Sequence, residues 1–483
     1  MVLNTFLFID PGTVFHPLGR NMRLQLCQVQ KDTENNPLFT EDFFADPPRR
    51  WEARFDNGYP NVIRDPADGK YKVWWSVFIT DPVSASTPLE KRPTTTYHPV
   101  NERTAALAYA ESTDGVHWIK PSLGLFEFEG SSANNLVMPI AHGTGISLDV
   151  DDPDPNRRYK MLTRMDWGPD NHILCAAFSP DGLRWSAPHR LVGFNPRADV
   201  HNFVFRDPMS RRYVLITRAW RDGMRVAAVS YSHDFLSWSD PVEILRGDGP
   251  RNQIYDMTVF RHHQHYLGLV SLFHEGDRDA LDHDLVDTGL AVAWDLDSWT
   301  FAAEGQQLIS RGSGSYPDGD WDCGCIFVSA PPIEDDGKLW FYWMGGNGPH
   351  GGFRETSFGR GWLEVDKFGH YSQVDASRPG TLALGPFNIP AQGSHQPVEL
   401  LVEVPEGGSV TYELWSDRYR QPVVGFEREA CRPLTESGWQ VLDFPGRPWR
   451  ADNPAAVIIV CHVTGGARLF GIRGMLHPRR IAD

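Results

Sequence analysis

The chain has 483 residues, of which 41% are hydrophobic and 22% charged. These proportions are typical of a globular protein and exclude a largely disordered chain, while the length predicts two or three domains. The 46 basic and 62 acidic side chains give a net charge of −16, which argues against a nucleic-acid backbone or an anionic membrane as a partner.

Residues 1–15 lack the basic segment of a secretory signal peptide and are interrupted by Asp10-Pro11. No stretch offers the roughly 18 apolar residues that a membrane helix needs. We therefore expect a cytoplasmic protein without a membrane partner. The six cysteines are scattered, and Cys323-Gly-Cys325 has no second ligand pair at zinc spacing, so we expect reduced, structural cysteines.

A turn motif that ends in tryptophan repeats along the chain. Each copy follows an apolar strand and places a polar turn before a short strand that carries the Trp. The tryptophans stand at positions 118, 185, 238 and 299, which suits units of about 50 residues with variable insertions. The copies are Ser112–Trp118, Ser179–Trp185, Ser232–Trp238 and Ala293–Trp299.

A predicted β-hairpin precedes each copy of this motif, and a fifth hairpin follows the last copy. Two hairpins make a four-stranded unit, and helical periodicity is nearly absent. Five such units that close on themselves form a five-bladed β-propeller, with an open all-β array as the alternative. The expected strand pairs are 59–63 with 71–75, 145–150 with 159–163, 201–205 with 213–217, 255–260 with 266–272, and 323–329 with 339–343.

The predicted fold is therefore all-β, with a five-bladed β-propeller over residues 51–379 and a C-terminal β-sandwich over 380–483. The C-terminal part has alternating strands without the tryptophan motif, which is typical of a sandwich. Residues 1–50 are expected to supply a strand, within 5–9 or 22–29, that closes the ring against the last blade. We expect the sandwich to pack on the propeller or to form a homo-oligomer.

Propeller topology converts the repeat into a predicted site, because the first strand of each blade begins, and the second ends, at the same face. The aspartates of turns on the opposite face, such as Asp65 and Asp207, are expected to be structural. At the predicted mouth, acidic side chains alternate with cations, and two loop tryptophans suit sugar stacking. These residues are Asp56 with Glu52 before it, His142, Arg164, Trp167, Asp199, His201, Arg218, Trp220, Asp256, His274, Glu275, Asp322 and His350.

Convergent carboxyl groups with cations around them suit cleavage of a glycosidic bond. One carboxyl group protonates the leaving oxygen, and the other attacks the sugar or activates water. Crowded like charges separate the two pKa values, and Arg and His hold the remaining carboxylates and the sugar hydroxyls. We predict Asp56 as nucleophile or base and Asp199 as acid, with Glu52 or Glu275 as alternative acids. The remaining mouth residues are predicted to bind substrate.

Other chemistries are less well supported by the sequence. There is no phosphate-binding loop and no Gly-x-Ser-x-Gly motif, so we predict neither a nucleotide cofactor nor an ordinary serine hydrolase. An ion on the channel axis, held by histidines 142, 201, 274 and 350, is a weaker alternative, and a structural calcium in the channel stays open. His262, His263 and His265 are expected to be surface residues of a hairpin turn.

Several short segments spread over the chain form a recognisable pattern: Phe6–Asp10, Trp51–Glu52, Tyr59–Val62, Arg158–Met161, Asp199–Phe203, Gln253–Tyr255, Trp321–Gly324 and Arg468–Ile472. This pattern resembles the five-bladed propeller glycosidases of glycoside hydrolase families 32 and 43, above all bacterial family 32-like proteins with a C-terminal sandwich. The resemblance implies that Asp56 occupies the position of the blade 1 nucleophile or base. The family 32 motif Trp-Met-Asn-Asp-Pro-Asn is replaced by Phe55–Gly58, and Asp199 stands where a Glu-Cys acid would be expected.

The sequence thus predicts an exo-acting glycoside hydrolase for a terminal sugar, of the furanosidic fructose or arabinose type, in an oligosaccharide. Insertions at 78–103 and 276–288 would narrow the mouth to a pocket. The alternatives are a glycoside phosphorylase or an inverting arabinanase-type enzyme on the same scaffold, and a non-catalytic carbohydrate-binding propeller. A small carbohydrate is the expected partner, and no cofactor is predicted.

Overall fold

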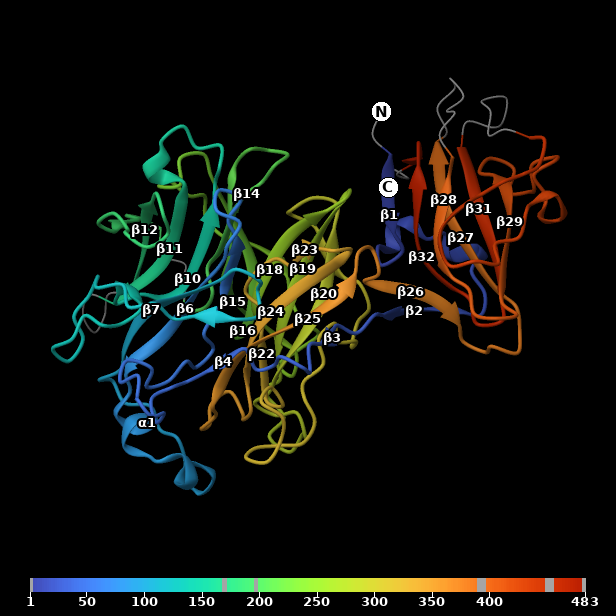
Figure 1. Ribbon diagram of the computed structural model, residues 1–483. Helices are drawn as coiled ribbons and strands as arrows, with labels where there is room; N and C mark the ends of the chain where they lie inside the picture. Colours follow the sequence, from blue (N-terminus) through green and yellow to red (C-terminus); the bar gives the residue numbers. More distant parts are fainter. Residues whose placement is uncertain (1–2, 167–171, 195–198, 389–396, 448–455, 480–483) are drawn as a thin grey trace.

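The computed structural model describes residues 3–166, 172–194, 199–388, 397–447 and 456–479, and these are almost entirely β (Figure 1). The predicted all-β class is confirmed. Within the described ranges, no helix is long and apolar enough to cross a bilayer. The helical elements are α1 (Pro82–Ser86) and the 3-10 turns η1 (Pro11–Thr13), η2 (His16–Leu18), η3 (Leu89–Thr94), η4 (Pro155–Arg157) and η5 (Arg428–Ala430).

Sheets 1, 2 and 3 follow one another along the chain as separate antiparallel sheets. In each, the first four strands pair in chain order, so two successive hairpins make one sheet, as predicted, and the additional strand β9 of sheet 1 pairs with β7. The second strands of sheets 1 and 3 are rich in β-branched and aromatic residues, which favour a pleated, buried surface. Sheet 1 contains β5 (Asn61–Arg64), β6 (Tyr71–Thr80), β7 (Thr104–Ser112), β8 (Trp118–Ile119) and β9 (Leu136–Pro139); sheet 2 contains β10 (His142–Leu148), β11 (Tyr159–Asp166), β12 (His172–Ser179) and β13 (His189–Arg190); sheet 3 contains β14 (Phe203–Arg206), β15 (Tyr213–Arg221), β16 (Met224–Ser232) and β17 (Val242–Leu245).

Sheets 4 and 5 are two similar units joined by a single parallel pair, Val286 with Cys325. The fifth unit lacks the tryptophan motif, and two short strands from the N-terminal region occupy its outer edge. Sheet 4 contains β18 (Gln253–His262), β19 (His265–Phe273), β20 (Val286–Ala293) and β21 (Trp299–Phe301); sheet 5 contains β22 (Cys325–Phe327), β23 (Ile333–Asp335), β24 (Lys338–Gly346), β25 (Thr356–Glu364), β3 (Gln30–Lys31) and β4 (Phe39–Thr40).

Buried apolar clusters connect each of these sheets to the next, and a further cluster connects sheet 5 to sheet 1. In that last cluster, Met344 and Phe358 of sheet 5 pack with Val62 and Trp75 of sheet 1. Side-chain packing, rather than continuous strand pairing, therefore links the last of the five sheets to the first. As a result, the first strands of different sheets lie near one another, although these sheets are far apart in the sequence.

A repeated polar contact reinforces these junctions. A buried aspartate in the turn of one sheet accepts a hydrogen bond from a tyrosine at or next to the start of the second strand of the following sheet. Asp65 also pairs with Arg158 and with Lys72, whose Nζ lies 2.8 Å from its carboxylate. The turn aspartates thus have the structural role expected from the sequence. The pairs are Asp65 with Tyr159, Asp149 with Tyr213 (2.7 Å) and Asp207 with Tyr266 (2.6 Å).

We expect Asp65→Asn to lower the free energy of unfolding by about 3–5 kcal/mol, because it leaves Lys72 and Arg158 without their buried counter-charge. Burial opposes the charge, but hydrogen bonds from Arg158, Lys72 and Tyr159 hold the pKa of Asp65 below its ordinary value. Its stabilising effect is therefore complete above about pH 4 and is lost as the pH falls through the native pKa. Urea unfolding of both proteins at pH 7 measures the loss of stability. The difference between the two proteins should be smaller at pH 3.

The control is Asp68→Asn, since Asp68 contacts the same Lys72 at 3.0 Å but is 42% exposed. An exposed ion pair contributes about 1 kcal/mol or less. Equal losses of unfolding free energy in the two variants would contradict the role of Asp65 as a buried counter-charge.

Two C-terminal sheets enclose a separate core that includes Leu400, Tyr412 and Ile459. The red strand β32 lies beside the blue strand β1 (Figure 1). The N-terminal strands expected at 5–9 and 22–29 therefore pair with β32 and β26, and residues 30–31 and 39–40 pair with sheet 5 instead. One sheet contains β1 (Asn4–Leu7), β2 (Met22–Leu26), β26 (Gly369–Gln373), β28 (Glu399–Glu403), β30 (Gly438–Val441) and β32 (Arg468–Gly474), and the other β27 (Gly380–Asn388), β29 (Ser409–Ser416), β31 (Ala456–Thr464) and β33 (His477–Pro478).

All six cysteines are free thiols, and five of them are buried. In the Cys-x-Cys segment, the thiol of Cys323 donates to the backbone oxygen of Asn347 (3.0 Å), and that of Cys325 to the oxygen of Gly348 (3.5 Å). These contacts fit the expected structural role.

Candidate active site

Asp56 lies in the turn that leads into β5, with a backbone φ of +55°. Its Oδ1 accepts hydrogen bonds from Arg54 Nε and Arg354 Nη2, each 2.9 Å away. Both arginines are buried, whereas the Asp56 side chain is 21% exposed. Burial disfavours the charge of Asp56, but the two guanidinium groups dominate and lower its pKa. Asp56 is thus an ionised carboxylate that is open to solvent, as its predicted role as nucleophile or base requires.

Side chains from sheets 4 and 5 hold this turn in place. Arg354 Nη2 also donates to Asn57 Oδ1 (2.6 Å), and Asn57 Nδ2 donates to the hydroxyl of Tyr255 (3.1 Å). Tyr255 stands at a β-bulge in β18 and its hydroxyl lies 3.0 Å from His350 Nε2. Burial and the charge of Arg354 lower the pKa of His350 to about 3, so its ring is neutral at pH 7.

Asp284 is a second carboxyl group near Asp56, beside His350, and it is not among the residues predicted from the sequence. Its Oδ1 lies 3.9 Å from His350 Nδ1, its Oδ2 accepts a hydrogen bond from the Gly351 amide (2.8 Å), and its side chain is 28% exposed. Burial raises the pKa of Asp284 in spite of the charge of Arg354, and the nearby Glu275 raises it further. The carboxyl group therefore holds its proton more firmly than an ordinary aspartate.

The surroundings of Asp199 favour its ionised form, whereas its predicted role as general acid requires the protonated form. Its carboxylate lies 2.6 Å from Arg164 Nη1 and 3.4 Å from His142 Nε2, and 60% of the side chain is exposed. Desolvation opposes ionisation, but the hydrogen bond from His142 and the charges of Arg164 and Arg218 lower the pKa of Asp199. A carboxyl group with a lowered pKa is a poor proton donor, which argues against Asp199 as the general acid.

The predicted residues Arg218 and Trp220 lie next to Tyr255, together with Arg225, which was not predicted. Arg218 lies over the rings of Tyr255 (5.3 Å) and Trp220 (5.7 Å), and Arg225 lies 4.8 Å from the centre of the Trp220 ring. Arg225 Nη1 in turn pairs with Glu275 at 2.5 Å. The Trp220 side chain is well exposed between the two arginines, as a surface for sugar stacking would have to be.

His201 and Asp256 are close to the cluster but buried. His201 stacks on Tyr59 with ring centres 5.9 Å apart, and burial lowers its pKa to about 3. Burial raises the pKa of Asp256 to about 7, against the opposing effects of Ser271 and Arg218. Its carboxyl oxygens are closed off from solvent, so a bound sugar would reach Asp256 only after a rearrangement.

Three predicted site residues lie away from the group around Asp56. Trp167 is outside the described residues. Glu52 pairs with Lys120, and Asp322 pairs with Lys31 of β3 at 2.7 Å. His274 lies 2.6 Å from Asp287 and lines a separate cavity of 720 Å³. Among the described residues, the four histidines of the alternative ion site do not converge.

The structure gives Glu52 a structural role. Its Oε2 accepts hydrogen bonds from Lys120 Nζ (2.8 Å) and from the Asp42 amide (3.0 Å), and both charged side chains are buried. We expect Glu52→Gln to lower the free energy of unfolding by about 3 kcal/mol, because the buried ammonium group of Lys120 loses part of its counter-charge. Any activity measured per folded molecule should not change. Urea unfolding measures the first effect and an activity assay of the folded protein the second, with the exposed Glu129→Gln as control.

The residues around Asp56 therefore combine an ionised carboxylate, Asp56, with a carboxyl group whose pKa burial raises above its ordinary value, Asp284. Arg354 and His350 lie between them and are held by the same hydrogen-bond network. Two carboxyl groups whose pKa values are pushed apart are what acid–base chemistry on a glycosidic bond needs. An exposed indole and guanidinium groups are side chains of the kind that can bind sugar rings and hydroxyls.

Comparison with known proteins gives no match to any family model and none to a curated protein sequence. Among solved structures, the chain is similar to a β-1,2-mannobiose phosphorylase from Listeria innocua, with 12% identity, a TM-score of 0.48, and coverage of 71% of this chain and 98% of that one. It is also similar to a glycosyl hydrolase from Bacteroides ovatus (13% identity, TM-score 0.45, coverage 71% and 97%). A third is an N-acetylgalactosamine deacetylase from F. plautii, with 13% identity, a TM-score of 0.43, and coverage of 71% of this chain and 96% of that one. The three differ in chemistry, and none of them fixes the reaction of this chain.

Proposed function

We propose that the protein is a glycoside hydrolase in which Asp56 is the nucleophile or base and Asp284 is the general acid. The observation that carries this proposal is the contrast between the two carboxyl groups. Two buried arginines favour the charge on Asp56, whereas burial and Glu275 favour the proton on Asp284. Asp199, Arg164 and Trp220 would bind the sugar rather than transfer a proton.

The proposal includes the architecture expected from the sequence. The five sheets would be the blades of a propeller, with the cluster at one mouth, and the two C-terminal sheets would form a sandwich. The cyclic order of the apolar clusters supports the first part, and the shared core of the C-terminal sheets supports the second. We keep the proposal of an exo-acting enzyme for a terminal furanosidic sugar.

A screen of substrates tests this function. Purified protein is incubated with aryl furanosides and pyranosides and with fructo- and arabino-oligosaccharides, and the released sugar is measured. Asp56→Asn and Asp284→Asn are assayed beside the unchanged protein. Cleavage of one substrate that both substitutions abolish supports the proposal, whereas no cleavage of any substrate contradicts it.

A glycoside phosphorylase is the second candidate, and Arg218 favours it. This guanidinium group is nearly buried, its Nη2 donates to the backbone oxygen of Asp199 (2.5 Å), and its Nε is buried without a partner among the described residues. A phosphate oxygen would satisfy such a donor after a rearrangement that exposes it, as for Asp256. The same screen with and without inorganic phosphate separates the two functions, because only a phosphorylase needs phosphate and releases a sugar phosphate.

A further inference from the structure

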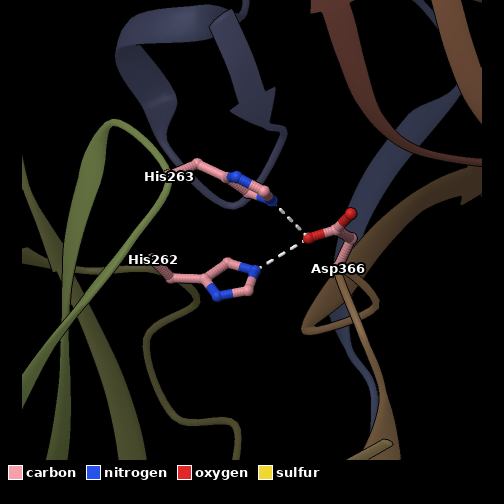
Figure 2. Close-up of side chains that lie close together, drawn as sticks. All are labelled: His262, His263 and Asp366. Carbon is pink, nitrogen blue, oxygen red and sulfur yellow. Dashed lines mark hydrogen bonds and ion pairs between the residues drawn. The ribbon is translucent and has the colours of Figure 1, made fainter. Parts of the chain in front are cut away.

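Two adjacent histidines and an aspartate meet on the side of sheet 4 that faces the C-terminal region (Figure 2). His262 and His263 belong to the hairpin turn between β18 and β19, and Asp366 belongs to the turn between β25 and β26. Oδ1 of Asp366 lies 2.8 Å from His262 Nε2 and 2.6 Å from His263 Nε2. Segments about one hundred residues apart in sequence therefore direct three possible ligand atoms to one point.

His262, His263 and His265 were all expected at the surface, and the structure corrects this for His262 and for His265, which is fully buried. The side chains of His262 and Asp366 are each only 11% exposed, and that of His263 is 35% exposed. Phe368 packs against the ring of His262, with centres 5.1 Å apart. The cluster thus has a sheltered inner side and one side open to solvent.

The spacing of the ligand atoms suits a small transition-metal ion. The three atoms lie within 4.8 Å of one another. Nitrogen and oxygen ligands lie about 2.0–2.1 Å from zinc, so that tetrahedral ligands are about 3.3 Å apart. Separations of 2.6 and 2.8 Å need to widen by only about half an ångström, which rotation of side chains in two turns can supply.

The chemistry of the cluster also suits a metal. Each Nε2 atom that faces the carboxylate must carry a proton to make the hydrogen bond, and a metal ion can replace both protons. Lys367, which follows Asp366 in the sequence, does not oppose a cation, because its Nζ is paired with Glu364 (2.6 Å) and with Glu403 (2.8 Å). The guanidinium group of Arg261 lies over the ring of Tyr266 and its Nε donates to the His263 backbone oxygen (3.1 Å).

We propose that His262, His263 and Asp366 bind a divalent transition metal of the zinc type, with the fourth position open towards solvent. Imidazole nitrogen and one carboxylate form a donor set that suits zinc better than calcium or magnesium, which prefer oxygen ligands. The metal would fasten the β18–β19 hairpin to the turn that precedes β26, and so connect sheet 4 with the C-terminal sheets. This site is separate from the proposed active site and does not depend on the proposed function.

Metal analysis of the full-length protein tests the proposal. The protein is stripped with a chelator, incubated with ZnCl₂, dialysed and analysed by mass spectrometry for zinc per chain, and its melting temperature is measured before and after zinc is added. We expect about one zinc per chain and a higher melting temperature with zinc. His263→Gln and Asp366→Asn should each lose both effects.

The control is His117→Gln, which removes another histidine that contacts an aspartate, Asp114, at 2.8 Å but has no second histidine beside it. This variant should bind zinc as the unchanged protein does. His263 is in an exposed turn, so its substitution decides the outcome even if Asp366→Asn does not fold. The proposal is wrong if the unchanged protein retains no zinc, or if His263→Gln retains as much, which would indicate binding by thiols or other histidines.

Discussion

On the proposed function, Asp56→Gly should reduce turnover of an aryl glycoside substrate by at least about 10³-fold, because it removes the ionised carboxylate from the reacting centre. Glycine fits this position, since the backbone of Asp56 has a φ of +55° and glycine adopts this conformation without strain. The substitution also leaves a space between Arg54 and Arg354, two buried cations that an added anion can approach. Azide should therefore restore turnover by at least about tenfold and yield a glycosyl azide.

Chloride distinguishes this catalytic role from a structural one. Both anions can compensate the charges of Arg54 and Arg354 and raise the melting temperature of the variant, but only azide can attack the sugar. Asp222→Gly is the matched control, because Asp222 has a φ of +54° in an exposed hairpin turn. We expect normal turnover in this control. If chloride restored activity as well as azide does, Asp56 would serve only to hold its two arginines in place.

The sequence was a good guide to the strands because each unit repeats the same local chemistry. The turn motif at Ser112–Trp118 forms as expected: Asp114 Oδ1 accepts the backbone amides of Val116 and His117, each at 2.8 Å. Such contacts are made within a few residues and can be inferred from the motif alone. The pairing of residues 4–7 with β32 could not be inferred in this way, because it joins strands from opposite ends of the chain.

The candidate site was only partly predictable for the same reason. Asp56 could be found from its place before the first strand of a repeated unit. Asp284 lies in an insertion without a repeat, and its raised pKa depends on burial and on Glu275. Asp322 and Glu52 occupy comparable positions in sequence, but lysines from distant segments, Lys31 and Lys120, pair with them. Tertiary packing decides which carboxyl groups pair with a lysine and which remain accessible to a ligand.

Asp284→Asn should remove the alkaline limb of the pH–rate profile. The general acid must carry its proton, so activity is expected to fall as the pH rises through the pKa of Asp284, which burial raises above the ordinary value of about 3.9. The acidic limb should remain, because Asp56 must be ionised and its arginine partners lower its pKa. At the optimum, we expect kcat/KM for a substrate with an alkoxide leaving group to fall about 10²–10⁴-fold.

The leaving group provides the decisive comparison. A dinitrophenolate departs without protonation, so Asp284→Asn should cleave a dinitrophenyl glycoside at nearly the normal rate. Asp279→Asn, in the same insertion but at an exposed position, should behave as the unchanged protein with both substrates. If the alkaline limb survived in Asp284→Asn but disappeared in Asp256→Asn, the proton donor would be Asp256. Its buried carboxyl group, with a pKa raised to about 7, would then have to become exposed when substrate binds.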